Sequence, residues 1–265
     1  MQDAKRHGVE VRAADVMDSA VDCTLEDLPH EPAVRLGLRL IVGLKSESAQ
    51  RIVEARMARP FDDADDLARR AGLEQHEMRL LACADALMSL AGHRRQQVWE
   101  AAALHRTPLL LRDAPVVEAV LELPAAAEGE EIVWDYASLG LTLRRHPLAL
   151  LRPRLSQQGL MSSEQLRDLP NGRLVKACGI VTLRQQPETA NGTIFVSIED
   201  ETGTVQVIVW RSLRELQRKP LLESRLLAVH GRWQREGEVR NLIARRLEDL
   251  TPMLGRLGTQ SRNFR

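Results

Sequence analysis

The sequence is poor in aromatic residues and has no excess of either charge. Phenylalanine, tyrosine and tryptophan together make up 3% of its 265 residues, which leaves few side chains on which nucleic-acid bases could stack. The 37 basic and 37 acidic residues give a formal net charge of zero. Because such a chain has no overall basic field, a site for nucleic acid or an anionic membrane would have to be a local patch.

Cysteines and long apolar runs are also scarce. Cys23, Cys83 and Cys178 lie far apart, so they form neither the close pairs of a metal site nor a disulfide framework, and we expect a reducing, cytoplasmic environment. No apolar stretch approaches the roughly 20 residues that cross a bilayer, and the N-terminus lacks the apolar core of a signal peptide. We therefore expect a soluble protein without a membrane partner, long enough for two modest domains or one large one.

Residue patterns typical of catalysis are absent as well. The sequence contains no phosphate-cradling P-loop, no serine–histidine–aspartate signature and no histidines at metal-ligand spacing. Four aspartates lie between Asp62 and Asp66, but the pattern places them at the start of a helix, where aspartate caps the first turn. We predict no catalytic residue, no metal site and no cofactor in this chain.

Residues 171–250 indicate a small five-stranded barrel of the OB type. Short β-rich runs, such as TIFVSIED and VQVIVW, alternate with turn residues, and the partly helical RSLRELQRK separates the third run from the fourth. Gly203 is expected to supply the positive φ of the ETGTVQV hairpin. Barrels of this kind bind single-stranded nucleic acid or oligosaccharide, so we expect binding here and no small-molecule chemistry.

Residues 33–104 predict helices joined by short turns, which must pack as antiparallel neighbours. AVRLGLRLIVGL indicates a helix, or a helix followed by a strand, that stops at Gly43. SESAQRIVEARMAR indicates the next helix, with Ser46 or Ser48 as its N-cap.

The turn around Gly43 is the first candidate nucleic-acid site. In helix-hairpin-helix modules a glycine turn before a helix lets backbone N–H groups approach a phosphate, and the helix dipole favours the anion. Gly43 fits this pattern, Lys45 replaces the second glycine, and Ser46 and Arg51 follow on the helix. The equally good alternative is that Gly43 only ends a helix. The local charge favours DNA, because basic residues outnumber acidic ones here; they are Arg35, Arg39, Lys45, Arg51, Arg56 and Arg59.

LACADALMSLAGHRRQ predicts a second hairpin with its turn near Asp85. Arg94 and Arg95 open the helix that follows, and basic residues at a helix start oppose its dipole unless an anion is present. This position suggests a phosphate contact, although a solvated surface pair is the more common explanation. With both hairpins counted, the fold class is α+β: a tandem helix-hairpin-helix domain over residues 33–104, followed by the barrel over 171–250.

The barrel itself offers four main candidate binding residues. Lys176, Arg184 and Arg232 supply positive charge on or beside predicted strands. Trp233 is the best aromatic candidate for base stacking, because it lies beside Arg232 near a strand end. Packing of Trp233 in the core or at the rim of the barrel is the favoured alternative.

Arg211 is a further candidate for the binding face of the barrel, and Phe195 and Trp210 are further candidates for base stacking. The strand pattern, however, places Phe195 more easily in the core.

The remaining segments frame these two domains. Residues 1–32 have too little apolar content for a core of their own, and we interpret them as the remnant of another domain. Residues 105–170 begin as a linker rich in proline, alanine and glutamate and continue as a helical connector. Residues 251–265 are expected to form a polar C-terminal tail.

Several long segments, taken in order, resemble the C-terminal part of bacterial C-family DNA polymerases. They are QDAKRHGVEVRAADV, AVRLGLRLIVGLKSESAQRIVEAR, PFDDADDLARRAGL, LACADALMSLAGHRRQQVWEA, EEIVWDYASLGLTLRRHPLALLRPRL, CGIVTLRQQPETANGTIFVSIEDETGTVQVIVW and SRNFR. The resemblance covers essentially the whole chain and is stronger to the error-prone, damage-inducible branch than to the replicative polymerase III alpha subunit. The linker contains no Gln-x-x-Leu/Met-Phe clamp-binding pentapeptide, which fits the error-prone branch.

This resemblance implies translesion synthesis after DNA damage, with DNA as the partner. The hairpin module would hold the primer–template duplex, the barrel would lie near the single-stranded template, and other translesion polymerase subunits are further expected partners. The family's palm, whose aspartates bind two Mg²⁺ ions for nucleotidyl transfer, would lie upstream of Met1, and residues 1–32 would be the end of the fingers region. The chain alone would then be inactive. The alternative is a standalone adaptor whose helices and barrel bind a protein partner.

Overall fold

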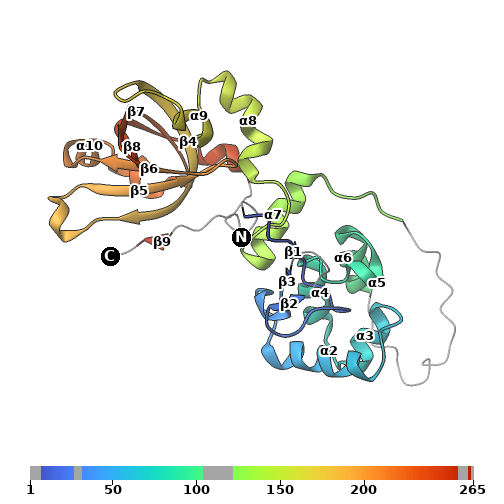
Figure 1. Ribbon diagram of the computed structural model, residues 1–265. Coiled ribbons are helices and arrows are strands. Elements are labelled where there is room, and N and C mark those ends of the chain that lie inside the picture. The colour runs from blue at the N-terminus through green and yellow to red at the C-terminus, as the bar shows by residue number, and fades with distance from the viewer. Residues whose placement is uncertain (1–6, 27–31, 104–121, 256–261, 264–265) are drawn as a thin grey trace. The chain divides into compact units, whose positions relative to one another are not determined.

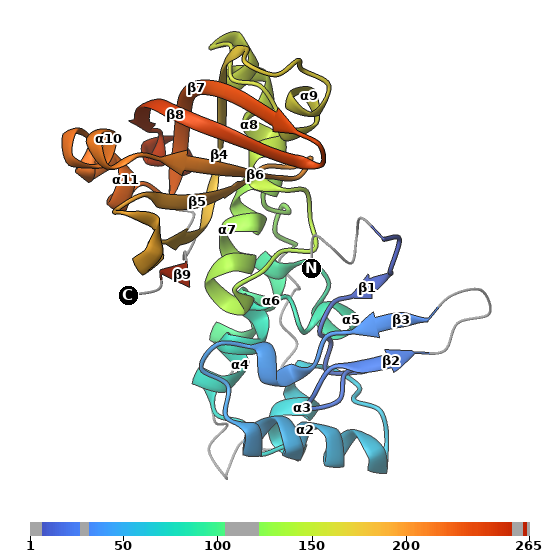
Figure 2. The same cartoon turned by 60° about the vertical axis from the view of Figure 1, so that its left-hand side comes forward.

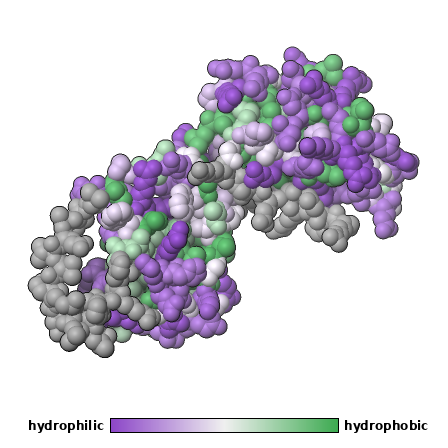
Figure 3. All heavy atoms as spheres, turned by 180° about the vertical axis from the view of Figure 1, so that it is seen from behind, coloured by the Kyte–Doolittle hydropathy of each residue, from purple (hydrophilic) through white to green (hydrophobic). Residues whose placement is uncertain are grey.

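The chain is organised around two separate apolar cores, each in its own unit (Figure 1). The computed structural model describes residues 7–26, 32–103, 122–255 and 262–263, and the two units are Met1–Arg144 and Arg145–Arg265. On the face drawn in Figure 3, hydrophilic side chains cover most of the described surface of each unit, with smaller hydrophobic areas among them. Among the described residues, no helix combines the length and the apolar character needed to span a membrane.

A small mixed sheet opens the first unit. Its strands are β1 (Val11–Arg12), β2 (Thr24–Glu26) and β3 (Ala33–Arg35). In Figure 2, β3 lies between β1, to which it is parallel, and β2, to which it is antiparallel. The Glu26 carboxylate accepts hydrogen bonds from Arg12 and Arg35, so one acid links the three strands.

The helix expected over residues 33–43 is wrong at its start. Val34 pairs with both neighbouring strands, and only the single 3₁₀ turn η1 (Leu38–Leu40) follows. Gly37 explains the break, because a Cβ at this position would lie 2.3 Å from the carbonyl carbon of Asp22. The chain therefore crosses another segment here at a distance that leaves no room for a side chain.

Helices form the rest of the first unit. They are α2 (Ser46–Ala58), α3 (Ala64–Arg70), α4 (Gln75–Cys83), α5 (Met88–Ala91), α6 (Arg94–Ala103) and α7 (Glu128–Leu139). Asp63 caps α3 by accepting from the N–H of Asp66, which confirms the aspartate cap expected at this helix start. Gly72, with a φ of +60°, follows the last turn of α3. The apolar stripes of the helices bury Ile52 and Leu67 completely.

The predicted connector, residues 105–170, is divided between the two units. Its helix α7 belongs to the first unit, whereas α8 (Pro147–Gln157) and α9 (Ser163–Arg167) belong to the second. Pro147 opens α8, where a helix needs no backbone donor, and Ser162 forms a capping box with Gln165 on α9. Residues 104–121, which contain most of the expected linker, lie outside the described residues.

The second unit contains a closed five-stranded barrel, as the sequence predicted. Its elements are β4 (Leu174–Gln185), η3 (Glu188–Ala190), β5 (Ile194–Glu199), β6 (Thr204–Val209), α10 (Arg211–Leu216), α11 (Arg218–Glu223), β7 (Leu226–Glu236), β8 (Val239–Asp249) and η4 (Thr251–Leu254). The strand order is β5-β6-β8-β7-β4, and pairing of β4 with β5 closes the ring (Figure 1). The expected helix between the third and fourth strands is the pair α10 and α11. Near the C-terminus, β9 (Arg262–Asn263) adds to β4 in parallel.

Alternation of side chains gives the barrel its inner and outer faces. Along β6, Val205, Val207 and Val209 are buried inside, while the residues between them point outward. β4 can pair with two strands because its register shifts between Val181 and Leu183, which bends the strand.

The β5–β6 hairpin turns without a positive φ, so the role predicted for Gly203 is wrong. The Asp200 carboxylate organises the turn by accepting from the N–H groups of Thr202 and Gly203 at 2.8 and 2.9 Å. Glycine is needed for space instead, because a Cβ on Gly203 would lie 2.7 Å from Oγ of Ser163 on α9.

Gly231 makes a prediction about the stability of the barrel. It follows a register shift in β7, and a Cβ there would lie 2.2 Å from the carbonyl oxygen of Ile243 in β8. We expect Gly231→Ala to lower the free energy of unfolding by about 1–3 kcal/mol, because the two strands must move apart. Urea denaturation followed by circular dichroism measures this. The exposed neighbour Gln234, changed to alanine, serves as control with an expected effect within about 0.5 kcal/mol; equal midpoints for the two variants would contradict the packing argument.

Candidate nucleic-acid interface

The first hairpin presents an accessible turn ahead of α2. Gly43 has a φ of +87°, which the left-handed turn requires, and Leu44 anchors the turn in the core. Lys45 and Ser46 are exposed. Lys45 is the N-cap, which corrects the prediction of a serine cap. No described residue accepts a hydrogen bond from the N–H groups of Ser46 and Glu47, so this helix start can bind an anion.

The basic patch expected around this turn does not form, because most of its arginines have internal partners. Arg35 pairs with Glu26, Arg39 with Asp22, Arg59 with Asp62 and Asp66, and Arg56 donates to the carbonyl oxygens of Val16 and Ser19. Arg51, a predicted phosphate contact, donates from Nε to the carbonyl oxygen of Ala71 at 2.8 Å and so holds the end of α3 against α2. Within the described residues, Lys45 is the one member of the predicted patch whose side chain has no such bond.

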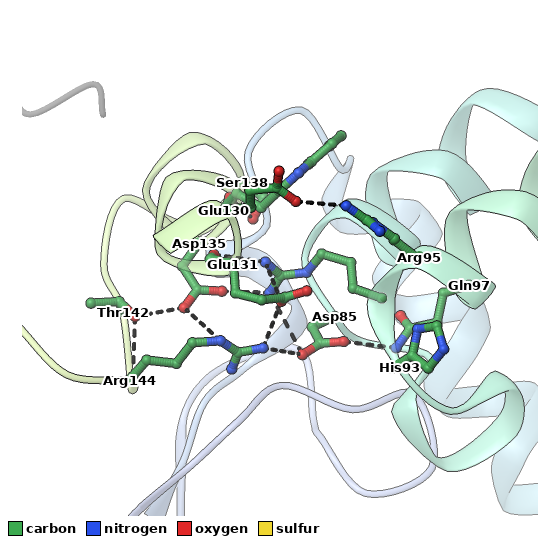
Figure 4. A network of polar contacts seen from close by, with 12 residues as sticks. Asp85, His93, Arg95, Gln97, Glu130, Glu131, Asp135, Ser138, Thr142 and Arg144 are labelled. Carbon is green, nitrogen blue, oxygen red and sulfur yellow. Dashed lines mark hydrogen bonds and ion pairs between the residues drawn. The ribbon is translucent and has the colours of Figure 1, made fainter. Parts of the chain in front are cut away.

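The second hairpin has no open phosphate site, and the predicted role of Arg94 is wrong. Arg94 is only 3% exposed. Its guanidinium contacts the carboxylate of Asp135 and lies 3.1 Å from that of Glu131, both on α7. Figure 4 labels these two acids. An arginine at a helix start needs a nearby anion to offset the helix dipole. The carboxylates of Glu131 and Asp135 supply that anion within the protein.

Arg95 is exposed but also engaged. Its Nη2 atom pairs with Glu130 of α7 at 2.8 Å (Figure 4). Beside it, the His93 ring contacts the carbonyl oxygen of Leu123 at 2.7 Å. A DNA phosphate at this helix start would have to displace α7 and the segment before it.

The Arg94 network joins four parts of the first unit. Asp85 occupies the turn predicted for it, with a φ of +62°, and accepts from Gln97 of α6 and from Arg144. Burial raises the pKa of Asp85, and the nearby Arg94 and Arg144 oppose that shift. The buried carboxylates of Asp85, Glu131 and Asp135 thus share the guanidinium groups of Arg94 and Arg144. These ion pairs fix α7 to the second hairpin (Figure 4).

Two of the four barrel predictions are also corrected. Arg184 is 7% exposed and donates from Nε to the carbonyl oxygen of Leu221 at 2.7 Å, so it holds α11 and cannot reach a ligand. Burial lowers the pKa of its guanidinium. Trp233 is 3% exposed and packs in the barrel core, so the alternative to base stacking is right.

The other two predicted residues, Lys176 and Arg232, lie on the outer face of the barrel. Lys176 stands in register with His230, and His230 with Arg246, so three basic side chains lie abreast across three strands. Burial, together with Lys176 and Arg246, lowers the pKa of His230. The imidazole is therefore neutral at pH 7. Glu248 lies 3.9 Å from the Arg246 guanidinium, so Lys176 is the one of these three side chains whose charge no ion pair with a described residue offsets.

Next to these lies an apolar row on the outer face; its first member, Phe195, was expected in the core, and the structure corrects that expectation. Strand register places Phe195 beside Ile208, Ile208 beside Ile243, and Ile243 beside Arg232. All three apolar side chains point away from the core and are partly exposed. A polar row runs parallel to it, formed by Ser197, Gln206, Asn241 and Gln234. The period-two pattern of each strand could indicate which side chains point outward. Only the strand register shows which outward side chains of neighbouring strands lie side by side.

Comparison with known proteins agrees with the helical fold of the first unit and the barrel of the second. The helix-hairpin-helix motif family matches residues 8–97, and the OB-fold nucleic acid binding domain family matches residues 175–250. The error-prone DNA polymerase of Ralstonia nicotianae is 52% identical over all of this chain and 25% of its own length. That of Bordetella parapertussis is 51% identical over all of this chain and 26% of its own length. The chain thus spans about a quarter of these relatives.

Likeness to solved structures is weak by comparison. Asparaginyl-tRNA synthetase from Pyrococcus horikoshii matches 34% of this chain and 23% of its own, with a TM-score of 0.30 and 20% identity. Likeness at this level carries no functional argument.

The Arg94 network makes a prediction that separates structure from binding. Arg94→Met leaves buried carboxylates without their partner, so we expect a loss of roughly 3–5 kcal/mol in unfolding free energy. Its neighbour Arg95 is the matched control, since Arg95→Ala removes an exposed ion pair worth about 0–1 kcal/mol. Urea denaturation measures both, and similar losses would show that Arg94 is not the structural member of the pair.

Proposed function

We propose that this chain, a C-terminal region of the error-prone DNA polymerase family, positions DNA for translesion synthesis and does not itself carry out nucleotidyl transfer. The observation that carries this proposal is the match of the whole chain to these polymerases, with a helix-hairpin-helix region and an OB-fold in the same chain. The described residues contain no group of three acidic, histidine or cysteine side chains that could hold a metal ion.

In this proposal the first unit binds duplex DNA and the second binds single-stranded DNA. The Gly43–Ser46 turn binds a phosphate of the primer–template duplex through backbone N–H groups and Lys45, which requires no sequence recognition. The outer face of the barrel binds the single-stranded template. Its apolar row accepts bases, and Lys176 and Arg232 meet the backbone.

The chemistry belongs to another part of the polymerase in this proposal. The Mg²⁺ ions of nucleotidyl transfer would be bound there, and further translesion subunits would join the same cytoplasmic assembly. The alternative, a protein-binding adaptor, predicts no affinity for DNA.

Binding of a fluorescent primer–template, followed by anisotropy, separates these two functions. We expect binding at about 50 mM salt that weakens steeply towards 200 mM, because each phosphate contact releases counterions. Oligonucleotides of unrelated sequence should bind almost equally. Absence of binding at the lower salt concentration would exclude the DNA-positioning function and favour the adaptor.

Charge reversal tests the division of work. Lys45→Glu should weaken duplex binding more than single-strand binding, and Lys176→Glu should do the opposite. Each change places a carboxylate near a phosphate, so we expect a loss of about tenfold on the preferred substrate. Both lysines are exposed, so neither variant should unfold. Equal losses on the two substrates would refute separate duplex and template sites.

A further inference from the structure

The barrel has a cavity at one end, and of the residues considered from the sequence only Arg211 lines it. It measures about 470 Å³ and lies between the β4–β5 loop and the helices that follow β6. The helices contribute Arg211, Arg214 and Arg218 to its lining, and the loop contributes Glu188 and Asn191. Arg211 and Arg214 are three residues apart on α10 and so share a face of that helix, whereas Arg218 is the first residue of α11 and lines the same cavity from there.

The three arginines differ in how far they are already engaged. Arg211 pairs with Glu215 at 2.9 Å, and Nη1 of Arg214 donates to the carbonyl oxygen of Gly192 at 3.2 Å. Arg218 is exposed, and no hydrogen bond or ion pair joins its side chain to another described residue. The cavity therefore contains one guanidinium that can accept a new anionic partner.

The cavity opens near the apolar row. Ile194 pairs with Val209 at this end of the β5–β6 ladder, one position from the pair of Phe195 and Ile208 that begins the row. Arg211 lies two residues beyond Val209, so at about 3.3 Å per residue the cavity starts within roughly 10 Å of the row. A strand that crosses the row can reach the cavity within a few nucleotides.

An exposed aromatic residue separates the row from the cavity along the chain. Trp210 follows β6 directly, is 52% exposed and occupies the N-cap of α10. In a chain with so few aromatic residues, an exposed indole beside an arginine-lined cavity is the combination that binds single strands by stacking and phosphate contact.

We propose that this cavity binds a backbone phosphate of the strand that crosses the apolar row. Arg218 supplies the free charge, and Trp210 stacks on the neighbouring base. Three arginines against two glutamates leave the lining with one net positive charge. This charge matches a singly charged phosphodiester better than a free phosphate dianion. The inference rests on the proposed binding of a single-stranded template.

Matched variants of the full chain test the site with a labelled oligothymidylate. Arg218→Ala should weaken binding about tenfold at low salt and lower the slope of log K against log salt by about 0.7, the value for one phosphate on a single strand. Its neighbour Lys219 is exposed and does not line the cavity, so Lys219→Ala should change affinity less than about twofold. Trp210→Ala should weaken binding at least about fivefold with an unchanged slope, because stacking releases no counterions.

The outcomes separate this inference from the function on which it rests. Binding by the unchanged protein, with equal effects of Arg218→Ala and Lys219→Ala, would overturn the cavity site and leave the proposed function intact. Absence of any binding by the unchanged protein would overturn both. Sodium phosphate, added at constant ionic strength, should not compete with the oligonucleotide; competition that disappears in Arg218→Ala would assign the cavity to free phosphate and overturn the phosphodiester.

Discussion

The pairing of Arg94 with the carboxylates of α7 is the interaction on which the helical unit depends. A guanidinium that is 3% exposed would be costly without its partners, so α6, α7 and the Asp85 turn must come together as one body. The same pairing determines which helix start of this unit is open to an external anion. The start of α6 is occupied by the protein's own acids, whereas the start of α2 is open to an external anion.

The barrel depends on a comparable constraint, the closure of one ring by a single long strand. β4 pairs with β7 along its first half and with β5 along its second, and the bulge at its centre permits both. Closure leaves the five strands with common inner and outer rows. The inner row buries Trp233, and the outer row exposes Phe195, Ile208 and Ile243 beside basic side chains.

A chain without net charge can still bind nucleic acid, provided that a few cations stay unpaired. Most arginines near the first hairpin form internal ion pairs or hydrogen bonds, and Lys45, Lys176 and Arg218 remain exposed without such a bond to another described residue. Arg232 is also exposed, and its Nε donates to the carbonyl oxygen of Gly172 at 3.2 Å. Under the proposed function, such sparse phosphate contacts bind DNA independently of its sequence, and each contact contributes little affinity. This suits a protein past which DNA must advance.

The sequence by itself determined the barrel, a helical insertion after its third strand, an aspartate cap on α3 and the turn near Asp85, because these follow from local periodicity and turn chemistry. Gly43, Lys45, Lys176 and Arg232, which the sequence predicted as nucleic-acid contacts, are exposed in the structure. Only the tertiary structure decided which cations are free. Arg94 and Arg184 look like surface arginines in sequence, yet their partners are 41 and 37 residues away. Strand register is also a long-range property. The apolar row and the cavity beside it can therefore be recognised only in the closed barrel.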